Sequence, residues 1–248
     1  ARTMDKRLPE DNDNGPDQGF HRAVRSYVLR AGRVTEGQKR ALEELWPVFG
    51  VESEKAPLDF GKLFGNDRPV IMEIGFGNGE ATWQMARAHP EENFLGVEVH
   101  KPGVGRLLLK VEEHGLENIR IACDDAVEVL RRQVADNSLA GVRIYFPDPW
   151  PKKRHHKRRI VQAPFVALLA SKMREGGVLH LATDWEPSAE YMLEVMQSAR
   201  EFENLSPSDG CCAKPEWRPL TKYEKRGERL GHKVSDLLFR RVRRGSKE

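Results

Sequence analysis

The chain has 248 residues and a mass of 28.3 kDa, a length at which one α/β domain can bury its core without disulfide bonds. Its 41 Lys and Arg residues nearly balance its 38 Asp and Glu residues, so only the distribution of charge can point to a partner. Three cysteines without a C-x-x-C pair disfavour disulfide bonds and a zinc site, and no apolar run reaches the ~18 residues of a membrane span. The sequence therefore predicts a soluble, cytoplasmic protein that does not bind a metal or a membrane.

Polar and basic residues dominate the first part of the chain. Residues 1–19 carry acidic side chains among Asn, Gly and Pro with few apolar groups, and this composition predicts a disordered tail. Residues 20–66 form a basic extension, with Arg22, Arg25 and Arg30, followed by a helix that we expect to begin after the N-cap Thr35 and to end at Pro47. Residues 67–248 are expected to be the core of a single domain that spans residues 20–248.

Strand and helix patterns alternate after Pro69. We expect strands at residues 70–74, 94–98, 118–123, 142–146, 178–182 and 234–242, and helices at residues 80–89, 104–114, 126–134, 164–174 and 186–200. Repeated strand–helix units predict an α/β, Rossmann-like fold with a mostly parallel central sheet and helices on both faces.

A glycine-rich turn joins the first expected strand of this series to its helix. Its sequence is Glu73-Ile-Gly75-Phe-Gly77-Asn-Gly79, and glycines here let the backbone turn tightly and approach a ligand that a Cβ would repel. The spacing G-x-G-x-G differs from the G-x-G-x-x-G of dinucleotide binders. A tight loop without a ligand remains an alternative for this turn alone.

Acidic residues stand at the carboxyl ends of three successive strands. Glu73 lies just before the loop, where it can face a cationic amino-acid group but would repel a pyrophosphate. Glu98 ends the second strand, where an acid can accept two ribose hydroxyls, and Asp125 follows the third, where a carboxylate can accept the amine of adenine. Taken singly, the two glutamates can be solvated edges and Asp125 an N-cap; together they indicate a nucleoside site.

A proline-rich segment follows the fourth strand. In Tyr145-Phe-Pro-Asp-Pro-Trp-Pro151, the prolines stiffen the backbone around Asp148 and Trp150. A rigid acid beside an aromatic ring can stack a base and hydrogen-bond its edge. The alternative is a structural turn with a core tryptophan.

The next eight residues are all basic or histidine. They are Lys152, Lys153, Arg154, His155, His156, Lys157, Arg158 and Arg159. A charge run is usually a solvated face, but this one adjoins the expected site, and such a density of positive charge attracts phosphates. We therefore expect RNA contact here, with the histidines part of the basic patch rather than metal ligands. The basic residues 240–244 either extend this surface or form a solvated tail.

Several of these motifs resemble those of the bacterial tRNA (guanine-N7-)-methyltransferase family. The resemblance rests on residues 73–79, on Gly-Val-Glu-Val-His at 96–100 and on Phe-Pro-Asp-Pro-Trp-Pro-Lys-Lys-Arg-His at 146–155. It is extended by Ala-Thr-Asp-Trp at 182–185 and Arg-Pro-Leu-Thr-Lys-Tyr-Glu at 218–224, and covers residues 20–242. Tyr223 stands where the family often has Phe, which should preserve the aromatic contact.

The resemblance implies a Rossmann-like class I methyltransferase that uses S-adenosyl-L-methionine and acts on tRNA. Glu73, Gly75, Gly77, Gly79, Glu98, Asp125 and Asp148 would contact the cofactor, and Asp148 would also be the catalytic residue. Lys152, Asp184, Thr221, Lys222, Tyr223 and Glu224 would bind the substrate, and Arg154, His155, His156, Lys157, Arg158 and Arg159 would contact RNA. The residue types alone indicate a ligand site at the acids and RNA contact at the basic run, whereas residues 221–224 resemble an ordinary polar turn.

The implied reaction is methylation of guanine N7, in the tRNA variable loop, by direct in-line displacement. N7 carries a lone pair that needs no deprotonation, so catalysis rests largely on positioning the two reactants. A carboxylate such as Asp148 or Asp184 could stabilise the positive charge that develops on the base, or could orient the guanine through its N1 and N2 donors. The target base must be splayed out or flipped to react. The protein is expected to act as a monomer or a weak homodimer.

Three other classes of protein share part of the pattern. An NAD-dependent oxidoreductase would have the longer glycine motif and a loop that accepts a pyrophosphate. A small-molecule methyltransferase would have no use for the basic run at residues 152–159. An RNA-binding module without activity would not need acids at three strand ends. An RNA methyltransferase accounts for both halves of the pattern.

Overall fold

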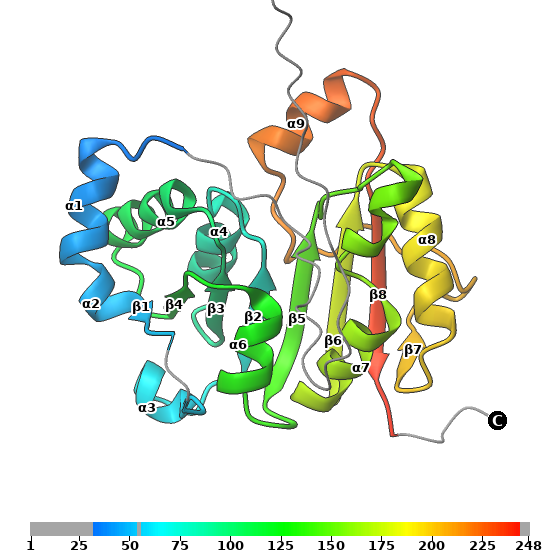
Figure 1. The fold of residues 1–248 in the computed structure, drawn as a ribbon, viewed down its shortest axis with the longest axis horizontal. Coiled ribbons are helices and arrows are strands. Elements are labelled where there is room, and N and C mark those ends of the chain that lie inside the picture. The colour runs from blue at the N-terminus through cyan, green and yellow to red at the C-terminus, as the bar shows by residue number, and fades with distance from the viewer. Residues whose placement is uncertain (1–31, 54–55, 244–248) are drawn as a thin grey trace, which may run out of the picture.

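The computed structural model describes residues 32–53 and 56–243. These residues form an eight-stranded sheet with helices packed on it (Figure 1). Its order is β1-β4-β3-β2-β5-β6-β8-β7. The strands are β1 (Gly50–Val51), β2 (Val70–Ile74), β3 (Asn93–Val97), β4 (Ile119–Ala122), β5 (Leu139–Tyr145), β6 (Met173–Thr183), β7 (Phe202–Asn204) and β8 (Ser235–Arg241). Strands β1 to β6 pair in parallel, and β8 runs antiparallel to both of its neighbours. The expected tail at 1–19, the basic residues Arg22, Arg25 and Arg30, and Arg244 lie outside the described residues.

Helices cover both faces of the sheet. On one face lie α1 (Glu36–Glu44), α4 (Glu80–Ala88) and α5 (Lys101–His114), and on the other α6 (Ala126–Gln133), α7 (Ala163–Lys172) and α8 (Glu186–Gln197). Alternation along the strands supplies both cores: Ile71 packs with α4 and α5, whereas Met72 packs with the opposite helices. The predicted fold, a mostly parallel sheet between helices, is therefore confirmed. None of the helices in the described ranges is long and apolar enough to cross a membrane.

The structure differs from the sequence prediction at short or polar elements. Four short elements were not expected: β1, β7, α3 (Phe60–Phe64) and the 3₁₀ helix η1 (Lys153–Arg158). Two to six residues give too little periodicity to predict a helix or strand. Pro47 does not end the first helix; α1 ends at Glu44, and Pro47 lies in the first turn of α2 (Trp46–Phe49), where its missing N–H costs nothing. Strand β6 begins at Met173, within the range expected for the preceding helix, and its pairing with β5 is irregular before Gly141.

The polar segment at residues 221–224 is also more ordered than expected. Thr221 caps α9 (Lys222–Arg229), accepting a hydrogen bond from the backbone N–H of Glu224. In Figure 1 this helix lies beyond the carboxyl ends of β5 and β6, on the face that carries α4. The loops after β2 to β6 meet at the same edge, because the carboxyl ends of parallel strands coincide there. The candidate site is built at this edge.

Candidate active site

The glycine loop between β2 and α4 adopts the backbone conformation for which glycine is required. Gly75 and Gly77 have φ angles of +71° and +62°, and a Cβ at either position would point into open space. The loop is also packed tightly from behind, because a Cβ on Gly103 in α5 would lie 2.0 Å from the carbonyl oxygen of Gly77. Gly103 was not predicted as part of the site. Together these glycines leave a cradle of bare backbone that faces a cleft.

Glu98 holds the glycine loop in place. One carboxylate oxygen accepts the backbone N–H of Gly77 at 2.8 Å, and the other accepts the N–H groups of Val99 and His100 at 2.7 and 3.3 Å. A carboxylate offers about four acceptor positions, so capacity remains for a ribose hydroxyl. Glu98 is thus an organised part of the loop rather than a solvated edge.

Glu73 is buried beneath the same loop. Only 2% of it is exposed, and its carboxylate accepts the Thr82 hydroxyl at 2.6 Å. Burial raises the pKa of Glu73 to about 7, although the Thr82 hydrogen bond and the positive charge of Arg143 act in the opposite direction. A buried carboxyl whose charge is only partly compensated gains from a cationic ligand.

Asp125 both caps a helix and lines the cleft. Its Oδ1 accepts the backbone N–H groups of Val127 and Glu128 at the start of α6, which is the structural role left open by the sequence. No hydrogen bond within the described residues occupies its Oδ2. The N-cap and a ligand contact are therefore compatible.

The proline-rich segment after β5 is held in a strained conformation. Phe146 and Trp150 have positive φ angles of 52° and 42°, which cost bulky residues of order 1–3 kcal/mol each. Asp148, between them, is exposed, and no hydrogen bond joins its carboxylate to another described residue. Arg159 stabilises this conformation of the segment, because its guanidinium donates to the carbonyl oxygens of Pro149 and Trp150 at 3.0 and 3.5 Å.

Two adjoining clefts open at this edge of the sheet. The smaller, of about 200 Å³, is lined by Glu98, Asp125 and Ile160, among others. The larger, of about 640 Å³, extends from Glu73 over the glycine loop to residues 218–223. Asp148 lines both clefts, together with Gly75, Tyr145 and Phe146. The exposed carboxylate of Asp148 therefore lies where the two clefts meet.

The basic run divides into two sets. Side chains three residues apart share a side of a 3₁₀ helix, and His155 and Arg158 accordingly both contact Trp150, with centroid distances of 5.6 and 5.1 Å. Arg159 packs over Tyr191 and is half-buried. In contrast, Lys152, Lys153, Arg154 and Lys157 are exposed. The run therefore anchors the proline-rich segment with one set and presents positive charge with the other.

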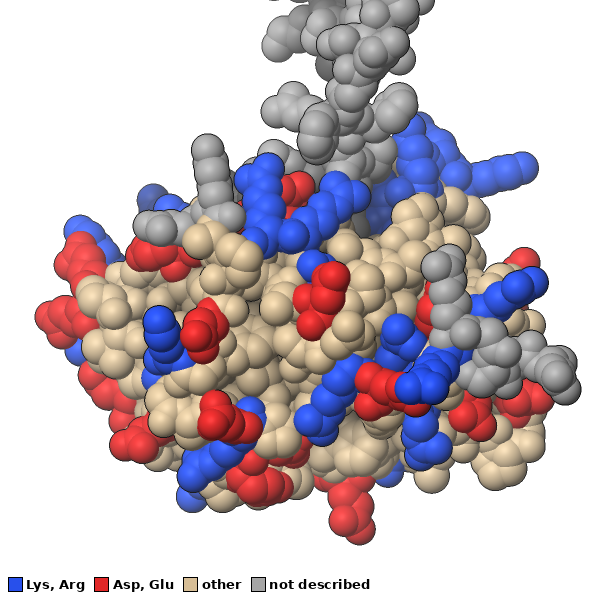
Figure 2. Space-filling model, turned by 90° about the horizontal axis from the view of Figure 1, so that it is seen from below, with Lys and Arg blue, Asp and Glu red and all other residues tan. Residues whose placement is uncertain are grey.

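The opposite end of the molecule lacks such a concentration of one charge. Figure 2 shows the structure from below, the end away from the carboxyl ends of β5 and β6, and red and blue side chains are interspersed over most of it. His89, Glu91 and Glu92, whose ligand atoms lie within 4.8 Å of one another, also lie away from the clefts, where α4 ends. They are the one group in the described ranges with the spacing of a metal site, and exposed acids commonly occur without an ion.

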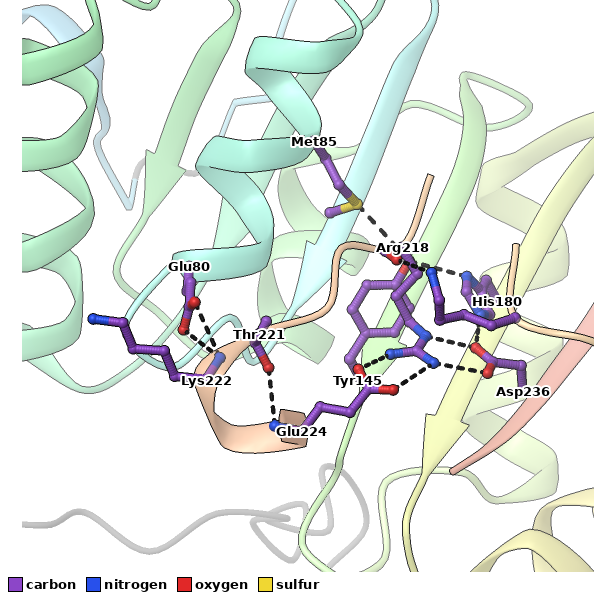
Figure 3. A network of polar contacts seen from close by, with 10 residues as sticks. Glu80, Met85, Tyr145, His180, Arg218, Thr221, Lys222, Glu224 and Asp236 are labelled. Carbon is purple, nitrogen blue, oxygen red and sulfur yellow. Dashed lines mark hydrogen bonds and ion pairs between the residues drawn. The ribbon is translucent and has the colours of Figure 1, made fainter. Parts of the chain in front are cut away.

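The N-terminal turn of α9 brings the expected substrate residues to the larger cleft. The Tyr223 hydroxyl donates to Asp184 at 2.9 Å, its ring contacts Phe146, and the backbone N–H of Lys222 donates to Glu80 in α4. Burial, followed by the Asp184 hydrogen bond, raises the pKa of Tyr223 to about 12. Glu224 differs from its neighbours, because it is 4% exposed and both of its oxygens accept hydrogen bonds from Arg218 (Figure 3).

A buried polar network beneath α9 was not predicted from the sequence. Tyr145 contacts His180 at 2.9 Å, and His180 contacts Asp236 at 2.7 Å (Figure 3). Trp217 donates its indole N–H to Nδ1 of His180, so this nitrogen is an acceptor and Nε2–H donates to Asp236. Alternation along β5, β6 and β8 places these side chains on one face, but only the tertiary structure shows that they pair.

Comparison with known proteins identifies close relatives. The family model described as "Putative methyltransferase" matches residues 67–237. The chain is 56% identical over 235 residues to the tRNA (guanine-N(7)-)-methyltransferase of Salmonella choleraesuis, covering 95% of this chain and 97% of the relative. It is 54% identical over 230 residues to the protein of that name from Alcanivorax borkumensis, covering 92% of this chain and 96% of the relative.

Solved structures share the fold at low sequence identity. The 16S rRNA methyltransferase KamB superposes with a TM-score of 0.54 at 16% identity, covering 77% of this chain and 95% of that one. A 16S rRNA (adenine(1408)-N(1))-methyltransferase from Catenulisporales acidiphilia, in a mutant form with its cosubstrate SAM, gives a TM-score of 0.52 at 17% identity, covering 80% and 99%. These likenesses support the Rossmann-like architecture alone.

Proposed function

Because the chain belongs to the tRNA (guanine-N(7)-)-methyltransferase family, we propose that its two adjoining clefts bind the methyl donor and the target guanine. The enzyme transfers a methyl group from S-adenosyl-L-methionine to N7 of a guanine in tRNA. The observation that carries the assignment of the clefts is the position of Asp148, which lines both of them.

The smaller cleft is suited to the adenosine part of the donor. Glu98 would accept a ribose hydroxyl with its remaining acceptor position, and Asp125 would accept the adenine amine through its unoccupied Oδ2. Gly75 and Gly77 provide a cradle that a Cβ would fill, with Gly79 opening the helix behind it. Glu73 lines the larger cleft, so the methionine part would extend into that cleft beside the glycine loop, with its amino group facing Glu73. A buried carboxyl is a favourable partner for that cation.

The larger cleft is suited to the guanine. When bound, S-adenosyl-L-methionine would supply a methyl group on a sulfonium; the lone pair of guanine N7 would form the new N–C bond in line as the S–CH3 bond breaks and the neutral thioether leaves. No general base is needed, so the protein contributes position and charge. Asp148 would orient the base or stabilise the positive charge that it gains, and Asp184 with residues 221–223 would hold its other edge.

The exposed side of η1 is suited to the tRNA backbone. Arg154 and Lys157 are exposed next to the segment that carries Asp148, so phosphates flanking the target nucleotide would reach them. Lys152 precedes them and would contact the substrate beside the cleft. By family resemblance, the target is the guanine of the variable loop, which must be splayed out of the tRNA to enter the cleft.

We further propose that residues 20–248 act as one catalytic unit, as a monomer or weak homodimer in the cytoplasm. The large hydrophobic side chains exposed among the described residues, Val34, Val48, Tyr223 and Leu230, are too few for an extensive apolar interface. The three cysteines are all free thiols, as in a reducing compartment.

The assignment of Asp148 is tested with methyl-labelled S-adenosyl-L-methionine and unmodified tRNA. Label is expected in 7-methylguanosine with the wild-type enzyme and is expected to be lost in Asp148→Ala, with donor affinity measured separately by calorimetry. Asp136→Asn is the matched control. Asp136 is an exposed acid paired with Lys172, and both residues lie just before the amino ends of β5 and β6, at the edge of the sheet opposite the clefts. Full activity of Asp148→Ala would refute the assignment; label in another nucleoside would refute the proposed target.

A further inference from the structure

Arg218 lies at the centre of the network in Figure 3, between two carboxylates from different elements. Its Nε and Nη2 donate to the two oxygens of Asp236 in β8 at 2.7 and 2.9 Å. Nη1 and Nη2 also donate to the two oxygens of Glu224 in α9. Arg218 is 2% exposed, so these contacts are made in a medium where an unpaired charge would be costly.

The Asp236 side of this arrangement is rigid. Asp236 also accepts the Nε2–H of His180, and β8 pairs with β6 along its length. Burial by itself would raise the pKa of Asp236, but the hydrogen bonds from His180 and Arg218 hold it below the ordinary value. Arg218 is thereby fixed to the central sheet.

Among the described residues, few other contacts hold the α9 side. Glu224 is the only buried residue among the eight of α9, and the large apolar side chain that follows the helix, Leu230, is 67% exposed. Helices in proteins are normally held by an apolar face, because a helix this short is not stable alone. The remaining contacts of the first turn are those of Lys222 with Glu80 and of Tyr223 with Phe146 and Asp184.

We propose that Arg218 is a positioning residue for the substrate cleft: by joining Glu224 to Asp236, it holds the first turn of α9, with Thr221 and Tyr223, against the cleft. Glu224 then acts through Arg218 and not by touching the RNA, since it is 4% exposed and both of its oxygens face Arg218. The inference rests on the proposed assignment of the larger cleft to the substrate. It predicts that Arg218 and Glu224 function as one unit.

A double-mutant cycle with Arg218→Met and Glu224→Met tests this dependence. Each single variant is expected to lower kcat/KM for tRNA by on the order of 100-fold, because a small misplacement of a positioning element can have that effect. The double variant is expected to lose no more than either single one, because the interaction is already absent. Multiplication of the two losses would overturn the proposal, since it would show that Glu224 makes an independent contact. Full activity of Asp148→Ala would instead refute the proposed assignment of the clefts, independently of the role of Arg218.

Hydrogen exchange distinguishes positioning from direct contact. It is measured on Glu224→Ala and Glu224→Gln, so that the test does not require Arg218→Met to fold. In Glu224→Ala, amides of residues 222–229 are expected to exchange faster than in the wild type, while those of β2 to β6 and the affinity for S-adenosyl-L-methionine are unchanged. Glu224→Gln, which retains one acceptor for Arg218, is expected to recover part of the activity and of the protection. Loss of activity in Glu224→Ala with unchanged exchange in α9 would overturn the proposal. Asp136→Asn again serves as the control.

Discussion

Glu73 is a buried carboxyl group whose charge the surrounding protein balances only in part. Two titratable groups act on its pKa: Arg143, whose guanidinium favours ionisation, and Glu98, which opposes it. Arg143 itself contacts the sulfur of Met85 and the rings of Phe94 and Trp217. Burial dominates and raises the pKa of Glu73 to about 7, so both the protonated and the ionised form are populated near neutral pH.

This protonation equilibrium predicts that donor binding depends on pH. A cationic amino group binds the ionised form of Glu73, so the apparent affinity for S-adenosyl-L-methionine should fall as pH decreases below about 7, approaching tenfold per unit. Calorimetry between pH 5.5 and 8 should also detect proton release on binding near pH 6.5. Glu73→Gln should bind more weakly, with little dependence on pH. A wild-type affinity that is constant over this range would contradict the prediction.

At the scale of single residues, the sequence indicates the chemistry of a side chain better than its hydrogen-bond partners. Acids at the ends of parallel strands could be recognised because strand order and direction bring them to one edge. The hydroxyl of Thr82 and the backbone donors around Glu98 could not be inferred, since they depend on loop conformation. Asp125 illustrates the limit, because the helix cap and the ligand contact are equally consistent with its position in the chain.

Among the elements, η1 has two sides with different expected roles. Arg154 and Lys157 share the exposed side, whereas His155 and Arg158 contact Trp150. Arg159, which directly follows η1, donates to the backbone of the segment that carries Asp148. Removing the exposed side should therefore change RNA affinity, and removing Arg159 should change the geometry of the site.

We expect Arg154→Ala/Lys157→Ala to bind tRNA more weakly and to reduce the slope of log affinity against log salt by about 1 for each phosphate contact removed. Affinity for S-adenosyl-L-methionine should be unchanged. Arg159→Ala should mainly lower kcat, with a smaller change in the salt slope. The control is Arg131→Ala, an exposed arginine in the last turn of α6. A salt slope equal to that of the wild type in the double variant would exclude these two residues from phosphate contact.

Long apolar elements were predictable, and short polar ones were not. Strands β2 to β6 lie within about three residues of their expected bounds, apart from the early start of β6, because buried parallel strands read as continuous apolar runs. Helix α9 carries no such signal, since its sequence, KYEKRGER, has one aromatic residue and the helix is attached by an ion pair. Sequence patterns report apolar burial, so an element held by a buried charge is missed.

For the whole molecule, two buried titratable groups should affect stability in opposite directions. Burial lowers the pKa of His180 despite its hydrogen bond to Asp236, and protonation would also place Nδ1–H against the Trp217 indole N–H. The unfolded chain takes up a proton at this histidine below about pH 6.5, so its contribution to the free energy of unfolding is lost as pH falls. Glu73 behaves inversely: the folded protein retains a proton between about pH 4.3 and 7 that the unfolded chain releases, so stability from this group is lost as pH rises.

The two contributions oppose each other below about pH 6.5, and Glu73→Gln should separate them. Each can reach about 1.4 kcal/mol per pH unit. Glu73→Gln should raise the free energy of unfolding at pH 8 by roughly 3 kcal/mol, since it removes the cost of ionising a buried carboxyl. Below pH 6.5 the variant should lose stability with decreasing pH more steeply than the wild type, because the titration of His180 is then unopposed. Urea unfolding from pH 5 to 8 measures both effects while Asp236 stays ionised, and parallel profiles for the variant and the wild type would show that Glu73 is already charged without its ligand.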